Sequence, residues 1–331
     1  MLLRSIATAA STLLLPKRSN VPPSSSAAPY VVDSTFKPFL PVGASRVTGV
    51  AVALSASGSE VLLAQQRNMT IPWLCLYTKD SNGLFRGTCD EGDTSTMDSP
   101  HGSQAAADTQ AGAGIFVTDI AGGTVKLFAQ DGRLLATGGT QGHPGVGKDP
   151  IQFSAPADIA VTKGGLVVVS DGDGGEANRV VALASGADLN SVAWVVGKNG
   201  TGSGEFQSPH SIAYDASTDT LFVADRGNER IVLLSPKDGS VVGTWGATCF
   251  PGGIPWGLRV DSAQRRLIVA DGAHASVFVL DLGERPHRKF PHPPTYQPIS
   301  PLATSCVSPQ DPSNSPRAIS TRTFPSQPRS A

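Results

Sequence analysis

Two histidines occupy equivalent places in this sequence, each directly after a proline and at the start of an apolar run. They are His101 in Pro100-His101-Gly102 and His210 in Pro209-His210-Ser211. Neutral imidazole nitrogen binds Zn²⁺ well, and a catalytic zinc site takes about three protein ligands. A histidine at the start of a strand can also serve only for packing or hydrogen bonding. The matching position of the pair favours two ligands of one zinc site.

Two arginines are candidates for binding a ligand. Arg226 follows Asp225 at the end of an apolar run, while the residues after the equivalent aspartates of the other repeats are uncharged. Arg67 ends the corresponding run near the N-terminus. Two guanidinium groups at one site would clamp a carboxylate, because their paired N–H donors match its two oxygens. We predict that Arg226 and Arg67 approach the same mouth of the fold as the histidines.

The segments that carry these residues are repeats of one pattern. Residues 206–246 contain four apolar runs of four to six residues, separated by turns rich in Gly, Asn and Asp, which predict a four-stranded antiparallel meander. Looser copies begin at Ser99, Gln152 and Ile254, and the repeat period is 46 to 56 residues. One such sheet cannot bury a core alone, so copies must stack into an all-β propeller with about five recognisable blades. Its first strands line the axis, which would bring the histidines together.

The propeller is predicted to occupy residues 47–282. Residues 1–46 have no acidic residue before Asp33 and resemble a secretory signal, with an organellar transit peptide or a disordered arm as alternatives. Residues 283–331 hold 11 prolines and 8 serines and show no alternation, so we expect a disordered tail without a strand. The last blade is therefore predicted to end near Leu282 with three strands.

Composition narrows the classes of partner and compartment. The propeller range carries 15 basic and 24 acidic residues, which argues against nucleic-acid binding. No apolar run reaches about 18 residues, so no transmembrane helix is expected.

In a secreted chain Cys75 and Cys89 could form a disulfide, while buried free thiols are the alternative. Asn68 and Asn199 begin glycosylation sequons. We expect a secreted, glycosylated monomer.

The residues of these motifs and their order along the chain resemble those of the NHL-repeat family and, more narrowly, of the peptidyl-α-hydroxyglycine α-amidating lyases. The resemblance covers about residues 40–282 and depends on LPVGASRVTGVAV, SPHG with IFVTD, QFSAPADIAV with VVVSDG, and SPHSIAYD with LFVADRGNERI. It implies a six-bladed propeller and a lyase (peptidylamidoglycolate lyase) that cleaves a peptide ending in α-hydroxyglycine to a peptide amide and glyoxylate.

The same resemblance implies the residues of the site. His101 and His210 match two of the three zinc histidines, and Arg67 and Arg226 match the two arginines that bind the substrate carboxylate. A channel calcium would be held by the backbone carbonyls of Val50 and Ser103. The zinc would act as a Lewis acid while a base removes the hydroxyl proton.

This sequence departs from the lyase pattern at three points. It lacks the Pro-His-Asp of the last blade. If Ile254-Pro255-Trp256-Gly257 belongs to that blade, Trp256 replaces the third zinc histidine and Gly257 the calcium aspartate. The order of the repeats favours the fifth blade for this segment, and the two ligands then have no match. A sixth blade is not recognisable. Asp173 stands where the catalytic tyrosine is expected, and an exposed Asp with the ordinary pKa of about 4 is a weak base. We therefore predict weak zinc retention and little turnover, with a non-catalytic NHL propeller that binds a protein or peptide partner as the alternative.

Overall fold

The computed structural model describes eleven segments of the chain. They are residues 47–54, 60–66, 74–79, 85–91, 96–106, 114–129, 132–186, 188–246, 253–274, 276–282 and 321–323. Apart from one turn of 3-10 helix, η1 (Arg226–Asn228), the regular elements of these segments are strands. Among the described residues no helix is long and apolar enough to cross a membrane.

The strands form five antiparallel sheets of four strands, which we call blades one to five. Blade one contains β1 (Val47–Leu54), β2 (Glu60–Gln66), β3 (Leu74–Lys79) and β4 (Phe85–Glu91). Blade two contains β5 (Pro100–Ala106), β6 (Gly114–Asp119), β7 (Thr124–Ala129) and β8 (Leu134–Gly138). Blade three contains β9 (Pro156–Val161), β10 (Val167–Asp171), β11 (Arg179–Leu183) and β12 (Val192–Val196). Blade four contains β13 (Pro209–Asp215), β14 (Thr220–Asp225), β15 (Arg230–Leu234) and β16 (Val241–Trp245). Blade five contains β17 (Pro255–Asp261), β18 (Arg266–Asp271), β19 (Ser276–Asp281) and β20 (Thr321–Thr323).

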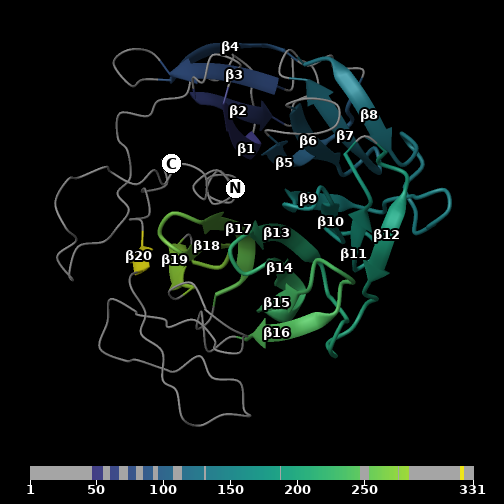
Figure 1. The fold of residues 1–331 in the computed structure, drawn as a ribbon, viewed down its shortest axis with the longest axis vertical. Helices are drawn as coiled ribbons and strands as arrows, with labels where there is room; N and C mark the ends of the chain where they lie inside the picture. The colour runs from purple at the N-terminus through teal and green to yellow at the C-terminus, as the bar shows by residue number, and fades with distance from the viewer. Residues whose placement is uncertain are drawn as a thin grey trace, which may run out of the picture.

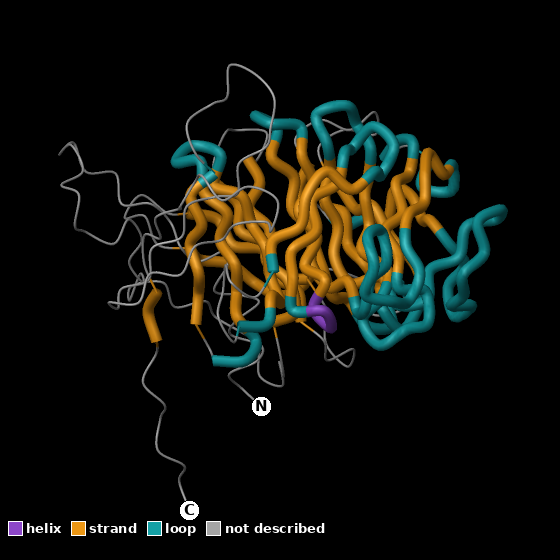
Figure 2. The backbone as a smooth tube through the Cα atoms, turned by 90° about the horizontal axis from the view of Figure 1, so that it is seen from below, coloured by secondary structure: helices purple, strands orange, loops and turns teal. Residues whose placement is uncertain are grey.

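The blades fan around a common centre with their first strands innermost, as Figure 1 shows. The first strands contact one another in chain order, from β1 through β5, β9 and β13 to β17. In the side view of Figure 2 the strands run between two rims of loops, and η1 lies at one rim. Residues at equivalent positions of the first strands therefore lie at the same level of the centre.

The core lies between the blades. Clusters of buried side chains join blade two to three, three to four, and four to five; their larger members include Phe116, Phe153, Phe206, Phe222 and Trp245. β6 and β14 are buried at every position, so the central strands of blades two and four are covered on both faces. The fourth strands β8, β12 and β16 are only partly buried, as the outer edge of a blade must be. This burial explains why the middle strands read as continuous apolar runs.

The predicted all-β propeller with about five blades and almost no helix is confirmed for the described residues. One strand corrects the prediction. Blade five has a fourth strand, β20, which pairs with β19 although it lies in the tail predicted to contain none. Without β20, the edge of β19 would leave backbone groups unpaired, and the two threonines of Thr321–Thr323 favour an extended backbone. Three residues are too few to show the apolar alternation that predicts a strand from the sequence.

Candidate metal centre

Each site histidine is the second residue of an innermost strand, and its ring is tied to the next blade. Nδ1 of His101 lies 2.7 Å from the carbonyl oxygen of Ala157, and Nδ1 of His210 lies 2.6 Å from that of Trp256. A carbonyl oxygen only accepts hydrogen bonds, so Nδ1 carries the proton in both rings. In the neutral ring the lone pair is therefore on Nε2. This is the tautomer that a metal-binding histidine adopts when a carbonyl orients it.

The loops before these strands are fixed by buried aspartates that end the second strands. Asp119 accepts from the backbone N–H of Ser99 at 2.7 Å, two residues before His101. Asp225 accepts from the N–H of Gln207 at 2.7 Å, three residues before His210. Both carboxylates are fully buried, so these hydrogen bonds hold the start of each first strand firmly.

Arg230 takes part in the same structural arrangement. Its guanidinium binds Asp225 and the carbonyls of Thr201, Gly202 and Glu205. These contacts give Arg230 a structural role, because they tie β15 to the loop before β13.

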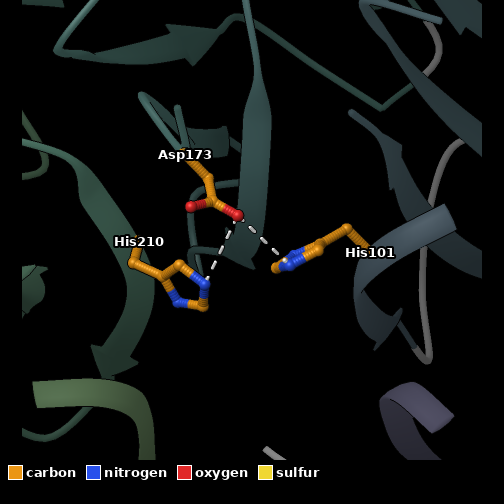
Figure 3. A group of neighbouring side chains, drawn as sticks. All are labelled: His101, Asp173 and His210. Carbon is orange, nitrogen blue, oxygen red and sulfur yellow. Dashed lines mark ion pairs between the residues drawn. The ribbon is translucent and has the colours of Figure 1, made fainter. Parts of the chain in front are cut away.

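Asp173 joins the two histidines from the blade between them. It lies in the turn after β10, and its Oδ2 is 3.5 Å from Nε2 of His101 and 3.6 Å from Nε2 of His210. One ligand atom from each of the three residues lies within 4.8 Å of the others. Figure 3 shows both imidazoles turned toward one oxygen of the carboxylate. The three residues could each offer one atom to a single metal ion.

The sequence alone predicts Asp173 to be an exposed residue and a weak base. In the structure its side chain is 19% exposed, because it points into the cluster instead of into solvent. A signal for this position existed in the chain order. Blade three stands between the two histidine blades, so the turn after its second strand had to face both rings.

The electrostatics of the cluster suit a metal ligand set. Burial lowers the pKa of His210 to about 4, although the Asp173 carboxylate opposes this shift. His210 is therefore neutral at neutral pH and can donate its Nε2 lone pair. Burial alone would raise the pKa of Asp173, but the neighbouring imidazoles of His210 and His101 and the guanidinium of Arg226 outweigh burial and hold this pKa below its usual value. Because Arg226 keeps its charge at neutral pH, Asp173 remains an ionised carboxylate.

Arg226 and Trp256 complete the cluster. Nη2 of Arg226 donates to Oδ1 of Asp173 at 2.7 Å, and its guanidinium carbon lies 4.9 Å from the centre of the Trp256 ring. The Trp256 ring also lies 5.4 Å from the His210 ring. Trp256 stands after Pro255, at the same repeat position as His101 and His210. This shared position places its indole beside the cluster.

The donor set fits zinc. Catalytic zinc sites in proteins use three ligands of this kind, and two histidines with one carboxylate is a known combination. Both histidines have the orienting hydrogen bond on the other ring nitrogen that such sites require. Zinc would be held by Nε2 of His101, Nε2 of His210 and a carboxylate oxygen of Asp173.

Other predicted site residues lie elsewhere or outside the description. Arg67 lies outside the described residues, so its approach to the site remains a prediction. Val50 lies in β1 and Ser103 in β5, two first strands that contact each other. The hydroxyl of Ser103 is buried and has no hydrogen-bond partner among the described residues. Calcium on the carbonyls of Val50 and Ser103 stays a prediction.

A second charged group crosses between the innermost strands. Asp158 of β9 accepts from the hydroxyl of Ser211 at 2.6 Å and from Nη1 of Arg259 at 3.1 Å, which links blades three, four and five. A Cβ added at Gly102 would come within 2.7 Å of Oδ1 of Asp158, so glycine allows this close approach. The sequence analysis missed this network because none of its members forms a motif.

Comparison with known proteins identifies the repeat. Residues 206–232 match the family model described as NHL repeat. The chain carries an NHL repeat. It falls within blade four, from the loop before β13 to the third residue of β15.

Two curated NHL repeat-containing proteins are similar in sequence to this chain. NHL repeat-containing protein 3 from Homo sapiens is 35% identical over 227 residues, which cover 67% of this chain and 62% of that protein. The Mus musculus protein of the same name is 34% identical over 223 residues, covering 66% of this chain and 60% of that protein. The chain thus spans about three fifths of the length of these relatives.

Solved structures are similar to this chain in fold at low sequence identity. The structure described as a streptogramin B lyase has a TM-score of 0.50 and 13% identity, covering 73% of this chain and 67% of that chain. A chain of a nidogen/laminin complex has a TM-score of 0.52 and 17% identity, covering 74% of this chain and 80% of that chain. At these identities the likeness concerns the fold alone.

Proposed function

We propose that this chain is a zinc-binding NHL propeller whose metal is held by His101, His210 and Asp173. The observation that carries the proposal is the convergence of three ligand atoms within 4.8 Å, from three successive blades. The hydrogen bonds on both Nδ1 atoms support it, because they turn the free Nε2 lone pairs inward. The neutral state of His210 adds to this, since proton loss is not required before the metal binds.

The partly exposed side of the centre is the place for a ligand. The side chains of Asp173 and Arg226 are 19% and 20% exposed, whereas that of His210 is 4% exposed. When bound, zinc would polarise an oxygen atom of the ligand as a Lewis acid. The indole of Trp256 offers an apolar wall beside the centre. We propose a peptide or a small molecule with an oxygen donor at its end as the ligand.

Lyase chemistry on a peptidyl-α-hydroxyglycine is the second candidate function. It is favoured by the placement of Arg226 beside the two histidines, which the resemblance to the amidating lyases implies. Cleavage to a peptide amide and glyoxylate requires a base for the hydroxyl proton. Asp173 is a poor base here, because its pKa is lowered and its Oδ1 already accepts from Arg226. We therefore propose that ligand binding outweighs turnover.

The test is calorimetric titration of the chelator-treated chain with Zn²⁺, followed by titration of the zinc-loaded chain with a peptidyl-α-hydroxyglycine. We expect one zinc per chain and a peptide affinity that depends on zinc. A chain that binds no zinc, or binds it equally well after both histidines are replaced by alanine, would contradict the proposal.

A further inference from the structure

The two oxygens of Asp173 have different partners. Oδ2 faces Nε2 of His101 and of His210, at 3.5 and 3.6 Å. Oδ1 accepts from Nη2 of Arg226 at 2.7 Å. A carboxylate with one oxygen bound to a guanidinium presents the other oxygen in a fixed direction. That direction is toward the two imidazoles.

Within the described residues, the turn around Asp173 donates no hydrogen bond to its carboxylate, which has its contacts with Arg226, His101 and His210. Asp173 lies in a run of glycines, Gly172, Gly174 and Gly175, and Gly174 has a φ of +82°. The backbone N–H groups of Gly172 and Asp173 both donate to the carbonyl of Ala155, at 3.0 and 3.2 Å. Glycine-rich turns have more accessible backbone conformations than other turns. The carboxylate therefore needs a partner from outside its own turn.

The guanidinium of Arg226 packs against the indole of Trp256. Its guanidinium carbon is 4.9 Å from the centre of the indole, which is within the range of a cation–π contact. The indole in turn depends on Gly272 of the next turn. A Cβ added at Gly272 would lie 2.1 Å from both Cδ1 and Nε1 of Trp256, a distance that real atoms do not tolerate. Contacts thus connect Gly272, Trp256, Arg226 and Asp173 in one line.

We propose that Arg226 is a positioning residue that holds Asp173 as a one-oxygen metal ligand, with Trp256 and Gly272 supporting the guanidinium. This inference rests on the proposed zinc centre and changes the role expected for Arg226. From the sequence, Arg226 is expected to bind the carboxylate of a ligand, whereas in the structure it binds the carboxylate of Asp173.

If Arg226 acted on the metal only through its charge, its removal would change the zinc affinity in the opposite direction from a positioning role. A positive guanidinium close to a divalent cation repels it, so removal of Arg226 would then tighten zinc binding. A positioning role predicts weaker binding, because a free Asp173 must lose conformational freedom when it binds the metal. The sign of the change separates the two roles.

The experiment measures zinc affinity by competition with a chromogenic chelator for the full chain and four variants. They are Arg226→Ala, Arg226→Lys, Asp173→Asn and the double variant of Arg226→Ala with Asp173→Asn. We expect Arg226→Ala to weaken zinc binding about 10–100-fold, as loss of an outer partner of a metal ligand does. Arg226→Lys should restore part of this loss. In the Asp173→Asn background Arg226→Ala should change the affinity less than about twofold, because its effect passes through Asp173.

Cobalt gives a second readout that a purely structural role would not move. With Co²⁺ in place of zinc, the visible absorption bands report the ligand geometry, so Arg226→Ala and Asp173→Asn should shift them in the same way. Arg259→Ala is the matched control, since Arg259 also pairs with an aspartate between the innermost strands but does not contact the cluster. Thermal unfolding confirms that each variant is folded.

The outcomes distinguish this inference from the proposed function. Zinc affinity that is unchanged or tighter in Arg226→Ala, or losses that add fully in the double variant, would overturn the positioning role while the zinc centre stands. Absence of zinc binding in the wild-type chain would overturn both.

Discussion

Nδ1 of His210 donates a hydrogen bond of 2.6 Å to the carbonyl oxygen of Trp256, the residue at its own repeat position in the next blade. His101 makes the same contact with Ala157, one blade after its own. The propeller repeat thus provides, twice, a backbone acceptor that fixes a histidine ring. The consequence is that Nε2 of each ring faces Asp173, and the proposed zinc centre follows from that orientation.

Replacing either ligand histidine should abolish tight zinc binding. His101→Ala or His210→Ala removes one of three protein ligands. Loss of a hydrogen-bond partner of a metal ligand lowers metal affinity by roughly 10–100-fold, so we expect loss of a ligand to lower the zinc affinity more than that. His143 is the matched control, because it lies exposed in a loop far along the chain from both rings. Chelator competition measures the affinities. Equal losses in His143→Ala and His210→Ala would point to non-specific binding by surface histidines.

The sequence indicated that the two histidines lie close together, but not that Asp173 lies between them. His101 and His210 share a proline, a strand start and a repeat position, so the period alone indicated that they lie at one level of the fold. Asp173 lies in a glycine-rich turn without a repeated pattern, and its partner Arg226 is 53 residues away. Pairing at such a distance depends on how blades stack, which hydrophobic periodicity does not specify.

The outer part of blade five shows a similar limit. The run that became β18 and β19 was visible as alternating apolar residues, and both strands lie within the predicted propeller. β20 has only three residues and pairs with β19 from a segment rich in Pro and Ser. Its position is set by the open edge of β19, which is a property of the folded sheet.

The carboxylate of Asp215 should make the free energy of unfolding depend on pH in the acidic range. Burial alone would raise its pKa, but hydrogen bonds from Arg265, Thr218 and Ser217 outweigh burial and lower the pKa. The folded-state pKa therefore lies below the unfolded value of about 3.9, and the resulting stability is present above that pH. It is lost as the pH falls through the folded-state pKa.

Comparison of the wild-type chain with Asp215→Asn tests this dependence. At pH 7 the variant should be less stable by about 3–5 kcal/mol, because it leaves the side chain of Arg265 buried without its charge partner. The gap should narrow below about pH 4, where Asp215 of the unfolded wild-type chain becomes protonated, and close as the pH falls through the lower folded-state pKa. Urea unfolding at several pH values measures it, with the exposed Asp188→Asn as control. A gap that stays constant down to pH 2 would show that the charge of Asp215 contributes nothing.

Gly272→Ala should disturb the centre from a distance. The new Cβ would collide with the indole of Trp256, so the ring must move and the guanidinium of Arg226 loses its support. We expect a stability loss of about 1–3 kcal/mol from overpacking and weaker zinc binding. Near-ultraviolet circular dichroism reports the indole and chelator competition reports the metal. In Gly164→Ala, where the Cβ has room, neither should change. An unaltered indole signal in Gly272→Ala would refute the contact.

Glyoxylate release should be slow. The proton acceptor that the lyase resemblance implies is replaced by Asp173, and a positioned base typically contributes about 10²–10⁴-fold to a rate. We expect the zinc-loaded chain to release glyoxylate from a peptidyl-α-hydroxyglycine at a rate lower than that of an amidating lyase by at least about this factor. Asp173→Tyr, which restores the residue type implied by the resemblance, should not increase zinc affinity. Rapid release by the unaltered chain would mean that another group acts as the base.

The zinc centre itself is tested most directly by anomalous diffraction at the zinc edge from crystals of the zinc-loaded chain. We predict one strong peak about 2.0–2.1 Å from Nε2 of both His101 and His210, and about 2.0–2.2 Å from one oxygen of Asp173. A peak bound by other residues, or crystals grown with zinc that show no peak between these three side chains, would contradict the proposed centre.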